Sequence, residues 1–165
     1  MIVISFDFDL SSWAWILSLL PIIFGVTYNK FEAFVGFLGL AQIDLNVDTI
    51  QAYLTNAAPS TSADSFKTDL QEITGQNGYP GGLGDITNLY SEAAGVGTLT
   101  ATDVVWTASG GAFGPFRYVP IFVNYAASSP ASEPLIAWWD YGSSISINDG
   151  ESFTLDFGAS VFTIT

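Results

Sequence analysis

The acidic residues near the end of the chain have the types and spacing that could support chemistry. Glu133 and Asp140, followed by Asp149 and Glu151, lie close together in the sequence. Two carboxylates about 5 to 10 Å apart across a cleft, one with a raised pKa, can hydrolyse a glycosidic bond. Turn chemistry explains Asp149 and Glu151 more simply, because they flank a glycine in a predicted hairpin turn. The sequence therefore predicts no catalytic residue.

Missing residue types narrow the chemistry further. The 165 residues include no His and no Cys. This removes the usual general base near neutral pH, thiol nucleophiles and the commonest zinc ligands, so only carboxylate or serine chemistry stays open. Calcium on the acidic oxygens is an alternative, although residues 148–151 lack the one-in-two ligand spacing of a calcium loop. We expect a protein that is not an enzyme, with no cofactor and no metal site.

A cluster of glycines at residues 75–84 (GQNGYPGGLG) has the composition of a phosphate-binding loop. Its spacing fits neither nucleotide-binding fingerprint, and no Gly-Lys-Ser/Thr follows. The neighbouring charge is Asp85, which would repel a phosphate. These residues therefore predict a turn-rich loop.

Charge and size limit the partners and the number of domains. The chain has 16 acidic and 3 basic residues, a formal net charge of −13, and 49% hydrophobic residues. So acidic a surface repels nucleic acid and keeps an apolar-rich protein in solution. A single domain of this length buries roughly two-thirds of its unfolded surface. We expect one domain without a nucleic-acid partner.

The first part of the chain differs from the rest. Residues 10–26 (LSSWAWILSLLPIIFGV) are uncharged and apolar, but they are at the short limit for a membrane span and contain Pro21. No Lys or Arg precedes Lys30, so the positive region of a signal peptide is missing. We predict a hydrophobic extension at 1–25 that reflects a miscalled start, since Val26 can be read from an alternative bacterial start codon. A real anchor or signal and a buried element are the alternatives, and the intact mass of the native protein tests them.

Helical patterns are confined to the N-terminal half of the predicted domain, 26–165. Asn29 and Glu32 resemble a helix-start signature, and apolar residues at helical spacing follow as far as Gly39. They predict one short amphipathic helix. Apolar residues at the same spacing over 64–74 predict a second one.

Alternating apolar and polar residues predict strands over most of the remaining chain. Strands are expected over 49–55 and 98–107, from Ala112 to Tyr125, over 134–141 and over 161–164. A hairpin is predicted around the turn Asn148-Asp149-Gly150. The fold class is therefore mainly β, an antiparallel β-sandwich of jelly-roll or immunoglobulin-like type with one or two short helices.

Strand alternation also separates two adjacent tryptophans. Trp138 and Trp139 must point to opposite faces of their strand. One can fill the core while a loop, a partner subunit or a ligand covers the other; the alternative is that both are packed inside. Trp138 is expected to share its face with Ile136 and Asp140, and Trp139 with Leu135, Ala137 and Tyr141. The candidate interface or ligand-contact residues are Trp138, Trp139, Tyr141 and Arg117.

Several stretches resemble small virion proteins of tailed double-stranded-DNA bacteriophages. They are TYNKFEAFVGFLGL, DTIQAYLTNAAPS, LQEITGQNGYPGG, GGAFGPFRYVPIFVNY and, most specifically, PLIAWWDYGSSISINDGESFTLDF. The resemblance covers about Val26 to Thr165 in order and leaves residues 1–25 outside. It implies a structural protein of the virion, a head decoration (cement) subunit bound to the capsid lattice or to other virion proteins, with no catalytic residues to carry over.

Two classes of function follow from these observations. The first is a non-enzymatic decoration subunit that stabilises the head and assembles as a homo-oligomer. The second is a receptor- or glycan-binding module of a tail or fibre, in which Trp138 or Trp139 stacks with Tyr141 on a sugar. A membrane-tethered β-domain that uses residues 10–26 is a weaker third hypothesis.

Overall fold

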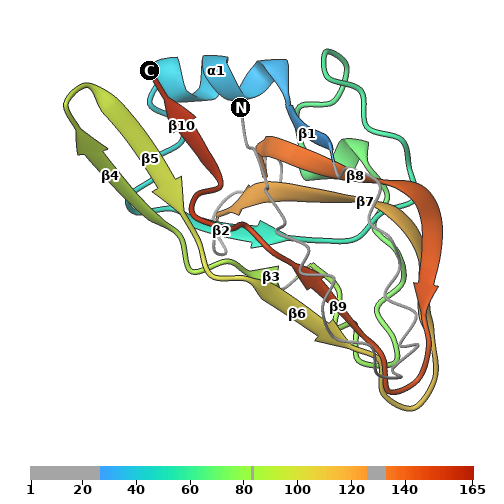
Figure 1. Cartoon of the computed structure of the whole chain (residues 1–165). Coiled ribbons are helices and arrows are strands. Elements are labelled where there is room, and N and C mark those ends of the chain that lie inside the picture. Colours follow the sequence, from blue (N-terminus) through green and yellow to red (C-terminus); the bar gives the residue numbers. More distant parts are fainter. Residues whose placement is uncertain (1–26, 83, 126–132) are drawn as a thin grey trace, which may run out of the picture.

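The computed structural model of the chain describes residues 27–82, 84–125 and 133–165 (Figure 1). Residues 1–26, on which the predictions of an extension and of an anchor fall, lie outside the described residues. Among the residues that are described, no helix combines the length and hydrophobicity that a membrane crossing requires. The first described element is a strand that begins at Thr27.

The largest sheet is five-stranded and antiparallel, with the order β1-β8-β7-β2-β3. Its centre is formed by two long strands that pair with each other, and each of them also pairs with a strand from the N-terminal half of the domain. The strands are β1 (Thr27–Lys30), β2 (Thr49–Ala52), β3 (Gly84–Asp85), β7 (Phe113–Asn124) and β8 (Leu135–Ile147).

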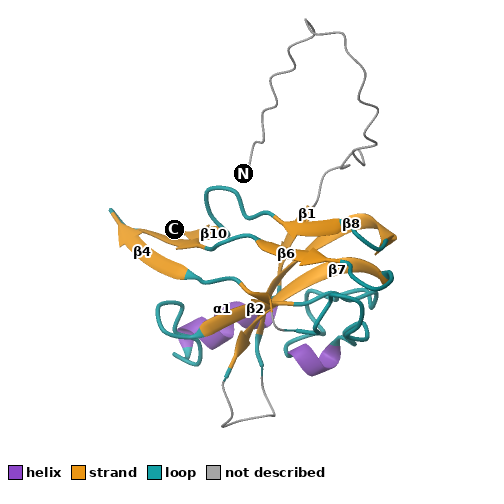
Figure 2. Ribbon diagram, turned by 90° about the horizontal axis from the view of Figure 1, so that it is seen from below, coloured by secondary structure: helices purple, strands orange, loops and turns teal. Residues whose placement is uncertain are grey.

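Two antiparallel ribbons pack against this sheet. One has three strands in the order β10-β5-β4, and the other pairs β6 with β9. The chain passes from β5 to β6 and from β9 to β10 after short breaks, so the ribbons follow one another along the same side of the molecule (Figures 1 and 2). Their strands are β4 (Leu89–Ala93), β5 (Val96–Thr100), β6 (Val104–Thr107), β9 (Ser152–Leu155) and β10 (Phe162–Ile164).

The core lies on both faces of the five-stranded sheet. The larger apolar cluster joins it to the ribbons, with Leu99 and Trp106 from the ribbons and Val119 from β7. A smaller cluster on the other side includes Phe122 and Leu70. Since both faces are covered, the central strands read as continuous apolar runs instead of clean alternation.

The single α-helix of the described residues, α1 (Glu32–Gly39), confirms the first predicted helix. It begins at Glu32 and not at Asn29, because residues 27–30 pair with β8 as β1. The ring of Phe34 packs edge-on against Phe162 of β10, with centroids 5.5 Å apart. The helix therefore covers one end of the three-stranded ribbon.

The second predicted helix, over 64–74, is wrong. The chain makes one 3₁₀ turn, Lys67–Asp69, and is extended on either side of it. Phe66 forms a bridge with Pro134, and Glu72 forms another with Thr55. These isolated bridges to residues distant in sequence pair the backbone and override the local helical pattern.

Of the hairpin predicted at residues 145–157, the turn is confirmed, but the pairing of its two strands with each other is wrong. Glu151 donates its backbone N–H to the carbonyl of Asn148 at 2.9 Å, which closes the turn. However, β8 pairs with β7 through Ile147, while β9 pairs with β6. The turn therefore carries the chain from the five-stranded sheet to the ribbon layer.

The remaining strand predictions are confirmed with changed bounds. The strand expected over 98–107 is divided into β5 and β6, and the last predicted strand is β10. All pairings in the three sheets are antiparallel. The mainly β, antiparallel class is confirmed, while a jelly-roll or immunoglobulin-like topology stays a prediction.

Candidate interaction surface

The adjacent tryptophans of β8 lie on opposite faces of the sheet, as predicted. Trp138 is 6% exposed and packs in the smaller cluster, its ring 4.5 Å from that of Phe31. Trp139 is half-buried against the larger cluster, between Tyr28 at 5.6 Å and Phe157 at 5.5 Å. Both indoles thus pack against side chains of this chain, and Trp138 has little surface left for a partner.

The faces predicted for Leu135 and for Ile136 are both wrong. Leu135 lies in the same cluster as Trp138, whereas Ile136, Ala137 and Trp139 belong to the other side. The ladder with β7 is irregular here, because neighbouring residues Ile121 and Phe122 oppose Ala137 and Leu135. The extra residue is a β-bulge, which shifts the alternation by one position.

Arg117 and Asp140 form a two-point ion pair between β7 and β8. The Nε and Nη2 donors of Arg117 each lie 2.8 Å from an Asp140 oxygen. This bonding lowers the pKa of Asp140 and raises that of Arg117. Asp140 opposes Tyr118, and pairing resumes only at Ile145 opposite Phe116. The pair therefore fastens the start of a wide bulge in β8.

The position of Tyr141 limits the predicted sugar-stacking site. Its ring lies edge-on to Phe153 of β9, with centroids 6.1 Å apart. Trp139 contacts Phe157 beyond the end of the same strand. Both rings of this pair are thus partly covered by the ribbon layer, and Trp138 lies on the other face of the sheet. Arg117, Trp138, Trp139 and Tyr141 do not form one common surface.

Sequence reasoning missed a cluster around Lys67. Its ammonium group lies 3.6 Å from Glu72 and 3.8 Å from Glu133. The same nitrogen is 4.4 Å from the ring centre of Phe122. A cation held by two carboxylates over an aromatic ring ties three distant segments together. The scarcity of basic residues was the only sequence signal for it.

Two tyrosines near this cluster differ in how their hydroxyls are bonded. Tyr79 donates to Glu72 at 2.6 Å and accepts the backbone N–H of Leu54 at 2.9 Å. The Tyr53 hydroxyl is buried without a hydrogen-bond partner. Burial raises the pKa of both phenols. Each therefore stays neutral and uncharged in the physiological range.

The acidic residues considered for a catalytic pair each have a structural partner. Glu133 pairs with Lys67 and Asp140 with Arg117. Asp149 accepts the backbone N–H of Gly110 at 2.8 Å. Within the described segments, no group of three or more acidic residues has the arrangement of a metal site.

The outward faces of the ribbon strands carry no ionisable side chain. In β6 and β9 the outward residues are hydroxyl or small aliphatic, since Trp106 and Leu155 point to the core. In β5 the core residue Leu99 fixes the same alternation. The outward residues, called here the ribbon face, are Leu89, Ser91, Ala93, Val96, Thr98, Thr100, Val105, Thr107, Ser152, Thr154 and Thr163.

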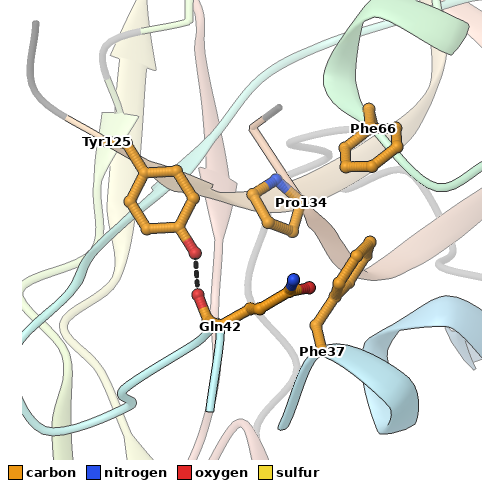
Figure 3. A pocket seen from close by; sticks show the side chains of 5 residues that line it. All are labelled: Phe37, Gln42, Phe66, Tyr125 and Pro134. Carbon is orange, nitrogen blue, oxygen red and sulfur yellow. Dashed lines mark hydrogen bonds between the residues drawn. The ribbon is translucent and has the colours of Figure 1, made fainter. Parts of the chain in front are cut away.

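A shallow apolar groove of about 320 Å³ lies beside the end of α1 (Figure 3). It is lined by Phe37, Gln42, Phe66, Tyr125 and Pro134. The Tyr125 hydroxyl donates to the backbone carbonyl of Gln42, so the one phenol of the lining is engaged. The groove offers contact surface and no reactive group.

Comparisons of the chain with protein-family models, with curated proteins and with solved structures find no match. The functional argument therefore depends on the residues and their geometry. The geometry consists of internally paired charges, covered aromatic rings and an uncharged ribbon face.

Proposed function

We propose that the protein is a non-enzymatic structural subunit of a tailed-bacteriophage virion, a decoration protein that binds the outside of the head and stabilises it. The observation that carries the proposal is the ribbon face, which has no ionisable residue on a chain of net charge −13. Such a surface can be buried against another protein at lower cost than a charged one, because no charge must be desolvated on binding. The sequence resemblance to phage virion proteins supplies the setting.

The paired charges support a structural role. Lys67 and Arg117, two of the three basic residues, are held by acidic partners within the chain. The carboxylates nearest to each other in sequence, at Asp149 and Glu151, bond the amides of turns. These groups rigidify the fold, and the chain has few positive charges left for attachment to a particle.

The number and position of copies on purified particles test the proposal. Decoration predicts many copies at regular sites on the head, seen by quantitative gel analysis and by electron microscopy. Heads made without the gene should break at lower temperature or milder osmotic shock than wild-type heads. Finding only a few copies, all at the tail tip, would contradict the decoration proposal and favour the glycan-binding hypothesis.

The charge distribution predicts how attachment responds to salt. Screening weakens electrostatic contacts and leaves apolar and backbone contacts in place. The protein should therefore stay on particles washed with a few hundred millimolar salt. Release under these conditions would contradict attachment through uncharged surface.

A further inference from the structure

Strand β4 forms an open edge of the ribbon layer. It pairs in regular antiparallel register with β5 over Leu89–Ala93, and the described residues place no strand on its other side. β4 lies at the margin of the molecule in both views (Figures 1 and 2). The strand contains no proline and no bulge, two devices that usually protect an edge. Its free backbone groups can therefore pair with another strand.

The hairpin turn decides which backbone groups are free. β4 and β5 are joined by Ala94 and Gly95, both with positive φ (53° and 82°), as in a tight two-residue turn. In such a hairpin the closing pair, Ala93 and Val96, exchanges backbone hydrogen bonds, and bonded pairs then alternate. The N–H and C=O groups of Tyr90 and Glu92 consequently point away from β5, toward the open edge.

The side chains of these two residues leave the edge uncovered. A Cβ at Gly97 would lie 2.2 Å from the Tyr90 hydroxyl, so the tyrosine ring extends across β5. The Glu92 carboxylate accepts the backbone N–H of Gly95 at 2.6 Å and is thus directed to its own turn. Neither side chain blocks an incoming strand.

The symmetric placement of the free groups about Ser91, and the chemistry of the outward side chains, favour a second copy of this chain as the partner. Two chains of net charge −13 repel each other, so they can meet only where acidic groups are sparse. The outward side of β4 and β5 is such a place, with Leu89 64% exposed and Val96 37% exposed. A two-fold contact must be self-complementary, and hydroxyls such as that of Ser91 both donate and accept.

We propose that β4 pairs antiparallel with β4 of a second copy about a two-fold axis at Ser91. Ser91 then faces its own equivalent as a non-hydrogen-bonded pair, and Tyr90 opposes Glu92 of the other copy with both backbone bonds made. Leu89 opposes Ala93, so the ribbon face becomes continuous across the dimer. This inference rests on the proposed function, because it specifies how the subunit assembles.

A single introduced cysteine tests the register, because the chain has none of its own. Residues directly opposite in a non-hydrogen-bonded antiparallel pair have Cα atoms about 4.5 Å apart, within disulfide range. Ser91→Cys in the full chain should give a covalent dimer under mild oxidation. Thr154→Cys, on the ribbon face in β9, is the matched control and should stay monomeric on a non-reducing gel.

A charge substitution tests the same contact without oxidation. Ser91→Lys places two like charges opposite each other and should weaken dimerisation by up to about fivefold in sedimentation experiments. Thr154→Lys changes the net charge equally and should not weaken dimerisation. Leu89→Lys serves as a second edge variant, and circular dichroism checks the fold of each.

A wild-type chain that is monomeric at all accessible concentrations would overturn the inference. Equal cross-linking of the two cysteine variants would also overturn it, as would a dimer indifferent to charge at positions 89 and 91. These measurements use the isolated protein, whereas decoration is tested by copies on the head. Failure of one can therefore be told from failure of the other.

Discussion

Arg117 donates two hydrogen bonds to Asp140, from Nε to Oδ1 and from Nη2 to Oδ2, each 2.8 Å long. Asp140 also accepts the backbone N–H of Gly142 at 2.7 Å, where the chain turns with φ of 90°. The carboxylate thus joins β7 to the first residues of the β8 bulge. Its ionisation state should influence how firmly that bulge is held.

Asp140→Asn should remove a pH-dependent part of the stability. Its folded pKa is lowered from the ordinary 3.8 by Arg117, so its contribution is present above about pH 4 and is lost as the pH falls through the folded value. The difference in unfolding free energy between wild type and variant should shrink in acid. Urea unfolding from pH 7 to pH 3 measures it.

Arg117→Met is the matched control for this effect. It removes the partner and leaves the carboxylate, so its difference from wild type should shrink over the same pH range. The double variant should behave like either single variant. Independent, additive losses would show that the two residues do not act as a pair.

Tyr53→Phe should leave the protein equally stable or make it more stable by about 1 kcal/mol. The substitution removes a buried hydroxyl that has no hydrogen-bond partner and keeps the ring in the core. Thermal and urea unfolding of the variant measure the change. A loss above 1 kcal/mol would mean that the hydroxyl is bonded in solution.

Tyr79→Phe is the comparison, because its hydroxyl is bonded to both Glu72 and Leu54. Its removal leaves a buried amide and a carboxylate without this partner, which costs roughly 1 to 3 kcal/mol. The same unfolding assays apply. The two substitutions delete the same atom, so their opposite signs would isolate the effect of hydrogen bonding.

Gly78→Ala should destabilise the loop at residues 75–84 far more than Gly110→Ala does. Both glycines have positive φ, 90° and 81°, so each alanine loses about 1 kcal/mol from the backbone conformation. Only at Gly78 would the new Cβ meet backbone, 2.0 Å from the carbonyl oxygen of Thr107. We expect about 2 kcal/mol of further loss there, measured by chemical denaturation. Equal losses would mean that the loop is not docked on β6.

Trp138→Ala and Trp139→Ala should differ in their effect on folding. Trp138 is almost wholly buried, and its truncation should remove roughly 3 to 5 kcal/mol. Trp139 keeps part of its ring in solvent, so about 2 kcal/mol is expected. Urea unfolding compares them, and Trp138→Phe should recover part of the larger loss. Equal losses would show that Trp139 is as fully packed as Trp138.

Local signals in the sequence were sufficient for the turns and strands and insufficient for their partners. The turn at Asn148-Asp149-Gly150 consists of residue types that favour turns, so its position could be predicted from the sequence. Whether the next strand returns to β8 or crosses to β6 depends on contacts of Phe153 with Trp106 and Phe116. Those residues are distant in sequence, and no local pattern reports them.

The helical spacing of Phe66, Leu70 and Ile73 does not come from a helix. Phe66 packs on Phe37 of α1, Leu70 joins the cluster of Trp138, and Ile73 joins the larger core. Each apolar residue is buried by its own neighbours on an extended chain. Periodicity alone does not distinguish this from one helix face.

The candidate site was predictable only in part. Strand alternation placed Trp138 and Trp139 on opposite faces, and the structure confirms it. The bulge that changes the faces of Leu135 and Ile136, and the contact of Arg117 with Asp140, depend on the register between β7 and β8. Register is fixed by packing across the whole sheet, which one strand's sequence does not contain.

The pairing of β1 with β8 also bears on how fast the protein can form. Thr27 opposes Asp140, so the first described strand waits for a partner more than a hundred residues later in the chain. Closing so long a loop is entropically unfavourable before any contact compensates for it, and folds dominated by such distant contacts reach the native state in milliseconds to seconds. During synthesis, β1 and α1 must leave the ribosome with their apolar sides uncovered until β8 follows. The net negative charge then opposes aggregation during folding, since electrostatic repulsion keeps incompletely folded chains apart until the sheet is complete.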